Sequence, residues 1–196
     1  KFHKAGTKIK LYRQNSMSVN KLGGLLKSIN FTSNEIAPKL KPTLNICLKD
    51  IKNQWPKKLP SGIIHGDLFI DNIFFNKNKF SGFIDFYFSS NDYLMYEIAI
   101  CINALCFDKK INSFVMNNKK IKNLIDGYES IRSFSKKEKN ALNVLCRGAA
   151  LRYLLTRIYD YFNTPKTALI QIKEPNEYLQ KLTVHNNLNN YKDYYK

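Results

Sequence analysis

Three polar residues stand at spacings that suit the transfer of a phosphoryl group. His65-Gly66-Asp67 is followed by four residues and then Asn72, and Asp85 ends an apolar run thirteen positions further on. Phosphoryl transfer from a nucleotide needs a carboxylate that orients the attacking hydroxyl and two oxygen ligands that hold Mg²⁺ on the phosphates. We therefore predict that Asp67 accepts the hydroxyl proton and that Asn72 and Asp85 bind the metal. We predict that His65 supports the loop backbone by hydrogen bonding.

The acidic residues of the chain concentrate around this motif, although the formal charge of the whole chain is +17. Between Ser61 and Asp108 there are six acidic residues and two basic ones, Lys77 and Lys79. Acids gathered on the least regular segment of a basic protein indicate a cation or general-base site. Charge alone leaves open that they are solvated turn acids, and the spacing of the motif favours the site.

The periodicity of the apolar residues changes along the chain. Helical spacing predicts helices from Asn15 to Ile29, after Thr32 or Ser33, after Asp92, and at roughly 117–131, 136–162 and 176–186. Short β-branched and aromatic runs predict strands at 63–64, 73–75 and 80–84, the last two joined by a turn at 76–79. The predicted fold class is therefore α+β, mostly helical, with a small β-hairpin region that carries the catalytic loop.

The motif HGDxxxxN with the strand-terminal Asp85 resembles that of the kinase-like phosphotransferases of the aminoglycoside phosphotransferase and choline kinase type. Two positions depart from the pattern expected there, since Ile70 stands in place of Pro and Glu97 in place of Asp. Neither is one of the three chemical positions. Within this group the chain is similar to bacterial homoserine kinases over the segments FHKAG, RQNSMS, LPSGIIHGDLFIDNIFFNKNKFSGFIDFYFSSNDYLMYEIAICINALCF, RGAALRYLLTRIYDYFNTP and KEPNEYLQKL.

The resemblance implies a protein-kinase-like fold that transfers the γ-phosphoryl group of ATP, with Mg²⁺, to the hydroxyl of L-homoserine. The product would be O-phospho-L-homoserine for threonine biosynthesis. The eight glycines allow no GxGxxG phosphate-binding loop, so residues 1–196 are expected to be the C-terminal lobe alone. The N-terminal lobe that covers ATP would then be absent, and we expect the isolated chain to have negligible kinase activity.

A homoserine site needs a cation for the substrate carboxylate and acceptors for its ammonium group. Arg147, Arg152 and Arg157 lie on one predicted helix in steps of five residues, and each step turns a helix by about 140°. The three cannot share one face, so we expect at least one of them to reach the pocket. The alternative for each is an ion pair with an acid such as Asp160. The other predicted substrate contacts are Asn91 and Asp92 for the ammonium group and Tyr87 as a wall.

Two alternative functions remain open on the sequence. The first is a phosphotransferase of the same fold that acts on choline, which would need an aromatic cage, or on an aminoglycoside, which would need a broad acidic groove. The second is a basic nucleic-acid-binding module. Only five of the 32 basic residues are arginines, the residue type best suited to bidentate phosphate recognition, so we predict no nucleic-acid partner.

The cellular setting is predicted from the apolar runs and the cysteines. No apolar run is long enough for a membrane span, so no membrane partner is expected. The four cysteines form no CxxC pair, and those at 101, 106 and 146 stand among apolar residues. This pattern is typical of buried thiols in a reducing cytoplasm. The sequence leaves the oligomeric state open.

Overall fold

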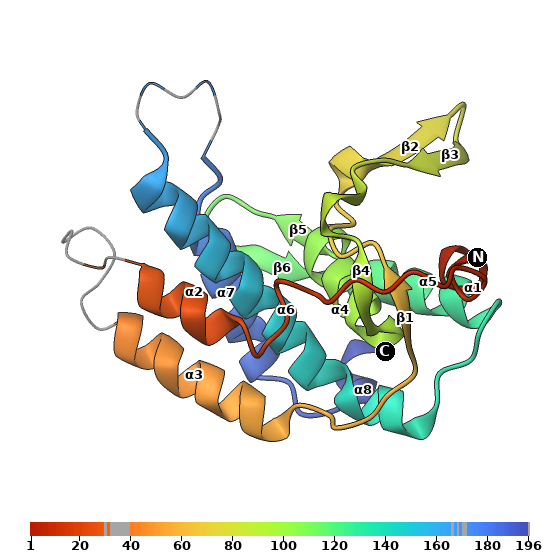
Figure 1. Cartoon of the computed structure of the whole chain (residues 1–196), viewed down its shortest axis with the longest axis horizontal. Coiled ribbons are helices and arrows are strands. Elements are labelled where there is room, and N and C mark those ends of the chain that lie inside the picture. The colour runs from red at the N-terminus through yellow and green to blue at the C-terminus, as the bar shows by residue number, and fades with distance from the viewer. Residues whose placement is uncertain (30, 32–39, 166, 168, 170–171, 196) are drawn as a thin grey trace.

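A computed structural model describes residues 1–29, 31, 40–165, 167, 169 and 172–195. The described residues form a helical body to which three two-stranded antiparallel sheets are attached (Figure 1). The helices are α1 (Phe2–Gly6), α2 (Leu22–Ser28), α3 (Leu40–Gln54), α4 (Leu94–Leu105), α5 (Asn118–Glu129), α6 (Lys136–Asn163), α7 (Asn176–Asn186) and α8 (Tyr191–Tyr194). The strands are β1 (Ser61–Ile64), β2 (Ile73–Asn76), β3 (Lys79–Phe83), β4 (Ser90–Tyr93), β5 (Phe107–Lys109) and β6 (Phe114–Met116). The predicted α+β class is confirmed.

The long helix α6 lies at the centre of the body and packs against α2, α3, α4 and α7. It begins with a capping box, in which the Ser135 side chain accepts from the backbone N–H of Glu138 and the Glu138 side chain accepts from the backbone N–H of Ser135. These bonds satisfy two N–H groups that a helix start otherwise leaves unpaired. Most residues of helix α4 are apolar, and most are buried, since α6 and β1 pack against it.

The strands place the predicted catalytic loop between the body and a projecting hairpin. β1 pairs with β4, so that Ile64 lies opposite Ser90 at the end where the loop begins. β2 and β3 form a hairpin whose turn residues Lys77 and Asn78 have φ values of 47° and 63°. A turn with two consecutive positive φ values matches the twist of antiparallel strands. The hairpin extends away from the helices in Figure 1, and the loop that precedes it lies against them.

Most predicted elements appear within a few residues of their expected bounds, with one clear exception. The helix expected from Asn15 to Ile29 covers only Leu22–Ser28. The Asn15 side chain instead accepts from the backbone N–H of Met17 at 2.8 Å, a local bond that competes with helix formation. The helix start expected at Thr32 or Ser33 lies outside the described residues. The short strands β4, β5 and β6 were not predicted, because their three or four residues carry little pattern of their own.

Three of the four cysteines lie in the core of the helical body, and none of the four forms a disulfide. Cys101, Cys106 and Cys146 are buried, and no disulfide joins any of the four cysteines. Burial raises the pKa of the Cys106 thiol to about 12, so this group is an unreactive core residue. Of the helices in the described part of the chain, none combines the length and the apolar composition of a membrane-spanning segment.

Candidate active site

The loop that carries Asp67 begins with a glycine that no other residue could replace without strain. Gly66 has a φ of +79°, in the left-handed region, and a Cβ added there would lie 2.7 Å from the carbonyl oxygen of Phe88. Only hydrogen fits between the loop and the segment after β3. The glycine therefore lets the chain turn sharply out of β1 and present the next residue, Asp67, to a pocket.

The backbone of Gly66 is held from two helices at once. From α4, the buried Glu97 carboxylate accepts from the backbone N–H of His65 and from that of Gly66, the latter at 3.2 Å. From α6, Arg152 Nη1 donates to the Gly66 carbonyl oxygen at 2.7 Å, and the Tyr153 hydroxyl lies 3.2 Å from the same oxygen. Charge-assisted bonds to buried backbone groups are strong, so both helices fix the position of Asp67.

The predicted loop support comes from the His65 ring. Its Nε2 donates to the carbonyl oxygen of Ile84 at 2.8 Å, and the ring is completely buried. Ile84 directly precedes Asp85, so this bond ties the loop that carries Asp67 to the segment that carries Asp85. The structure therefore gives His65 a bonding position that suits the predicted supporting role.

Asp67 sits where burial and neighbouring donors have opposite effects on its ionisation. The Tyr153 hydroxyl donates to Asp67 Oδ1 at 3.1 Å. Burial raises the pKa of the Asp67 carboxyl, while the nearby Arg152 guanidinium and the Tyr153 hydrogen bond lower it, and burial has the larger effect. A carboxylate with a raised pKa is a better proton acceptor than an exposed one.

Asn72 and Asp85 present oxygen atoms to the same pocket. Asn72 Nδ2 donates to the Asp67 carbonyl oxygen at 2.8 Å, which leaves its Oδ1 as the free acceptor. Asp85 has a left-handed backbone, with a φ of 59°, that caps the short helical turn of residues 86–88. Among the described residues no group of three or more His, Cys, Asp or Glu could hold a metal. One carboxylate and one amide oxygen instead fit Mg²⁺ that is held partly by nucleotide phosphates.

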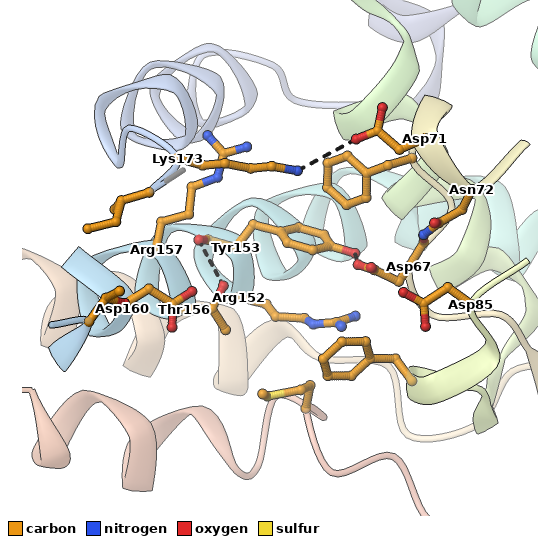
Figure 2. Close-up of a pocket in the computed structure, with 15 residues that line it drawn as sticks. Asp67, Asp71, Asn72, Asp85, Arg152, Tyr153, Thr156, Arg157, Asp160 and Lys173 are labelled. Carbon is orange, nitrogen blue, oxygen red and sulfur yellow. Dashed lines mark hydrogen bonds and ion pairs between the residues drawn. The ribbon is translucent and has the colours of Figure 1, made fainter. Parts of the chain in front are cut away.

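These residues line one pocket of about 520 Å³ beside α6 (Figure 2). The predicted base and both predicted metal ligands are on its wall, at the end nearest the hairpin. The rest of its polar wall is formed by α6 and by residues near Lys173. The charged, amide and phenolic groups that line the pocket are Asp67, Asp71, Asn72, Asp85, Arg152, Tyr153, Arg157, Asp160 and Lys173.

The three predicted arginines take different positions around α6. Arg152 and Arg157 line the pocket, whereas Arg147 does not. Arg147 forms an ion pair with Asp50 of α3 and donates to the Asn186 side chain at 2.9 Å, so it is not available to the pocket. Arg157 donates to a carboxylate as well, although to Glu177 and not to Asp160.

Tyr87, Asn91 and Asp92, predicted to contact the substrate, do not line the pocket. Tyr87 is 71% exposed, and the guanidinium of Arg13 lies over its ring. Asn91 Oδ1 accepts from the backbone N–H of Arg13, and Asp92 Oδ2 accepts from Asn15 Nδ2 at 2.6 Å. These side chains are occupied because the segment before α2 lies beside β4, a pairing between distant parts of the chain that spacing alone does not predict.

Sequence reasoning missed several residues that shape the site. Glu97 was noted only as a departure from an expected Asp, although an acid within the apolar run YLMYEIAI is a signal of a buried hydrogen-bonding role. Tyr153 gave no signal, because an aromatic residue on an apolar helix is usually part of the core. Asp71 and Lys173 are far apart in the sequence, and only the folded chain brings them to the same pocket.

The comparisons with known proteins agree with this geometry. Residues 25–132 match the model of the phosphotransferase enzyme family (APH), which is more than half of the chain. The chain therefore belongs to this family, as the sequence motif predicts. Its fold is similar to that of an ethanolamine kinase from Plasmodium vivax, with a TM-score of 0.60 at 16% identity, over 91% of this chain and 52% of that one. The predicted protein-kinase-like fold is thereby confirmed.

Within the family, the chain is similar to curated homoserine kinases. That of Allorhizobium ampelinum is 46% identical over 93% of this chain and 56% of its own length. Those of Xanthobacter autotrophicus and Rhodopseudomonas palustris are 43% and 41% identical over 98% and 99% of this chain, and each is covered over 59% of its length. The predicted similarity to homoserine kinases is confirmed, and the chain spans little more than half the length of these relatives.

Proposed function

We propose that the chain forms the catalytic part of an ATP-dependent homoserine kinase. The observation that carries the proposal is that Asp67, Asn72 and Asp85 line one pocket, in a chain similar to homoserine kinases over nearly its whole length. We also propose that residues 1–196 correspond to the C-terminal lobe and that the contacts covering ATP come from a further segment of the same polypeptide.

In the proposed reaction the substrate hydroxyl lies against Asp67. Its oxygen forms a bond to the γ-phosphorus of ATP, the bond from that phosphorus to the β–γ bridging oxygen breaks, and the hydroxyl proton passes to the Asp67 carboxylate. The Tyr153 hydroxyl orients that carboxylate through its 3.1 Å bond, and Arg152 holds the loop beneath it. Asn72 and Asp85 would hold Mg²⁺, which neutralises phosphate charge when bound.

The decisive experiment joins this chain to the part of the Allorhizobium ampelinum homoserine kinase that it does not match. The chimera is assayed for ATP-dependent phosphorylation of L-homoserine, choline, ethanolamine and an aminoglycoside. We expect L-homoserine to be the preferred acceptor and the 196-residue chain alone to give no measurable turnover. Preference for another acceptor would refute the proposed substrate, and turnover by the isolated chain would refute the proposed lobe assignment.

The role of Asp67 is tested in the same chimera with Asp67→Asn. We expect kcat to fall by about 10²- to 10⁴-fold, the usual contribution of a positioned general base. Asp108→Asn is the matched control, because Asp108 lies outside the pocket and pairs with Lys120 at the surface. Circular dichroism establishes that both variants are folded. An Asp67→Asn variant as active as the control would exclude Asp67 as the base.

A further inference from the structure

The pocket has a polar end that the phosphoryl-transfer residues do not use. Beyond Tyr153, the wall continues to Asp71 and Lys173, which face each other across the upper side of the pocket in Figure 2. Asp71 belongs to the short helical turn Ile70–Asn72 that follows the catalytic loop, four residues after Asp67. A ligand whose hydroxyl meets Asp67 therefore has this pair of charges within the same pocket.

Among the described residues, three cations line the pocket, and Lys173 has the weakest contacts with the protein. Arg152 is 2% exposed and donates to the Gly66 carbonyl oxygen at 2.7 Å. Arg157 donates through Nη1 to Glu177 at 2.7 Å and to the Glu174 carbonyl oxygen at 2.9 Å. The ion pair of Lys173 is with Asp71, at 3.9 Å between Nζ and Oδ2, and the two side chains are 59% and 74% exposed. An exposed pair at this distance contributes little stability, so a ligand can separate it at small cost.

We propose that Asp71 and Lys173 bind the head group of an α-amino acid, Lys173 taking the carboxylate and Asp71 the ammonium group. This inference rests on the proposed function and assigns the part of the site that selects its substrate. The two charges of an α-amino acid are attached to the same carbon, so their partners must be adjacent and opposite in sign. Asp71 and Lys173 meet that requirement, and their weak pair would be replaced by two charge-assisted contacts.

The surroundings of Lys173 favour a carboxylate ligand. Its Nζ lies 5.3 Å from the centroid of the Phe69 ring, which supports the side chain from one side. Arg157 lines the pocket on the same side as Lys173, but its guanidinium is already paired with Glu177. An amino alcohol has no carboxylate, so its ammonium group would take Asp71 and leave Lys173 without a partner.

Binding to the 196-residue chain tests the assignment without any need for turnover. Calorimetric titrations compare L-homoserine with aminopropanol, which lacks the carboxylate, and with γ-hydroxybutyrate, which lacks the amine. We expect L-homoserine to bind about tenfold or more tightly than either analogue, as one charged contact is lost in each. Lys173→Met should weaken L-homoserine binding by about tenfold and leave aminopropanol unchanged. Asp71→Asn should weaken both L-homoserine and aminopropanol and leave γ-hydroxybutyrate unchanged.

The control variant is Lys119→Met, which removes an exposed lysine of α5 outside the pocket. It should bind all three ligands as the unaltered chain does. Equal binding of L-homoserine by the Lys173→Met and control variants would overturn the assignment and leave the proposed function standing. Lys173-dependent binding of L-serine or L-threonine, with no homoserine turnover by the chimera, would support the amino-acid site and refute homoserine kinase activity. No binding of any hydroxy amino acid to the unaltered chain would overturn the assignment.

Discussion

The pKa of the Asp67 carboxyl depends on its burial and on two neighbouring side chains. Its burial raises the pKa of the carboxyl, and the Arg152 guanidinium and the Tyr153 hydroxyl each oppose that rise. As the proposed proton acceptor, Asp67 must be ionised to act, so the activity of the chimera should fall as the pH is lowered through this raised pKa. The acid limb of the pH–rate profile should therefore lie above the ordinary pKa of aspartate, about 3.9.

The Tyr153→Phe substitution tests this balance at the residue scale. Removing the hydroxyl removes a hydrogen bond that favours the ionised carboxylate, so the pKa of Asp67 rises further and the acid limb moves to higher pH. The profile of kcat/KM against pH in the chimera measures the shift. Tyr159→Phe is the control, since Tyr159 is a partly exposed tyrosine of the same helix outside the pocket. A limb at an unchanged or lower pH in Tyr153→Phe would contradict the proposed role of the hydroxyl.

At the scale of elements, α6 packs closely against the segment after α3 because one residue of α6 is a glycine. Gly148 lies within α6, and a Cβ added to it would lie 2.5 Å from Cζ3 of Trp55. Glycine inside a helix usually destabilises it relative to alanine. Here the close approach of the indole reverses that rule, because alanine would force the two segments apart.

We expect Gly148→Ala to lower the free energy of unfolding by about 1–3 kcal/mol, the usual cost of overpacking a core. Gly127→Ala in α5 is the matched comparison, since a Cβ there meets nothing within 4 Å. That variant should gain about 0.5–1 kcal/mol from helix propensity. Urea unfolding of both variants measures the difference, and a stabilising Gly148→Ala would show that Trp55 moves away at no cost.

At the scale of the whole molecule, stability should depend on pH through a buried histidine. His185 is completely buried, with Nε2 donating to Asn103 Oδ1 at 3.2 Å and Nδ1 2.9 Å from the Tyr194 hydroxyl. Burial lowers the pKa of His185 to about 3, and the nearby charges of Lys181 and Arg147 lower it as well. The unfolded chain, in which the pKa is about 6.5, therefore binds more protons at this position between pH 6.5 and 3.

The free energy of unfolding should consequently fall as the pH drops below 6.5. The contribution of this one group approaches about 1.4 kcal/mol per pH unit within that window. His185→Gln removes the titrating group, so its unfolding free energy should change less between pH 7 and 5 than that of the unaltered chain. Urea unfolding at several pH values gives the two slopes. Equal slopes would mean that His185 is protonated in the folded state.

The sequence predicted those parts of the fold and the candidate site whose arrangement depends on residues close together in the sequence. Asp67, Asn72 and Asp85 belong to one short segment, so their spacing and the hairpin between them determine where they lie. Arg147 and Asp92 were misplaced relative to the pocket because Asp50 and Asn15, their partners, come from distant segments. The same limit applies to Lys173. Its proposed role depends on its pairing with Asp71, which is distant in the sequence, so no local pattern indicates it.

The hydrogen bonds to the backbone of Gly66 determine which substitutions elsewhere in the protein can affect Asp67. Glu97 of α4 accepts from the Gly66 N–H, and Arg152 of α6 donates to the Gly66 carbonyl oxygen, so the backbone of one residue joins the two helices. Any core substitution that shifts α4 against α6 also moves the residue that follows, Asp67. Heating or mutation that loosens this helix pair should therefore abolish catalysis before the chain unfolds, and selection for activity would act on residues that never approach the substrate.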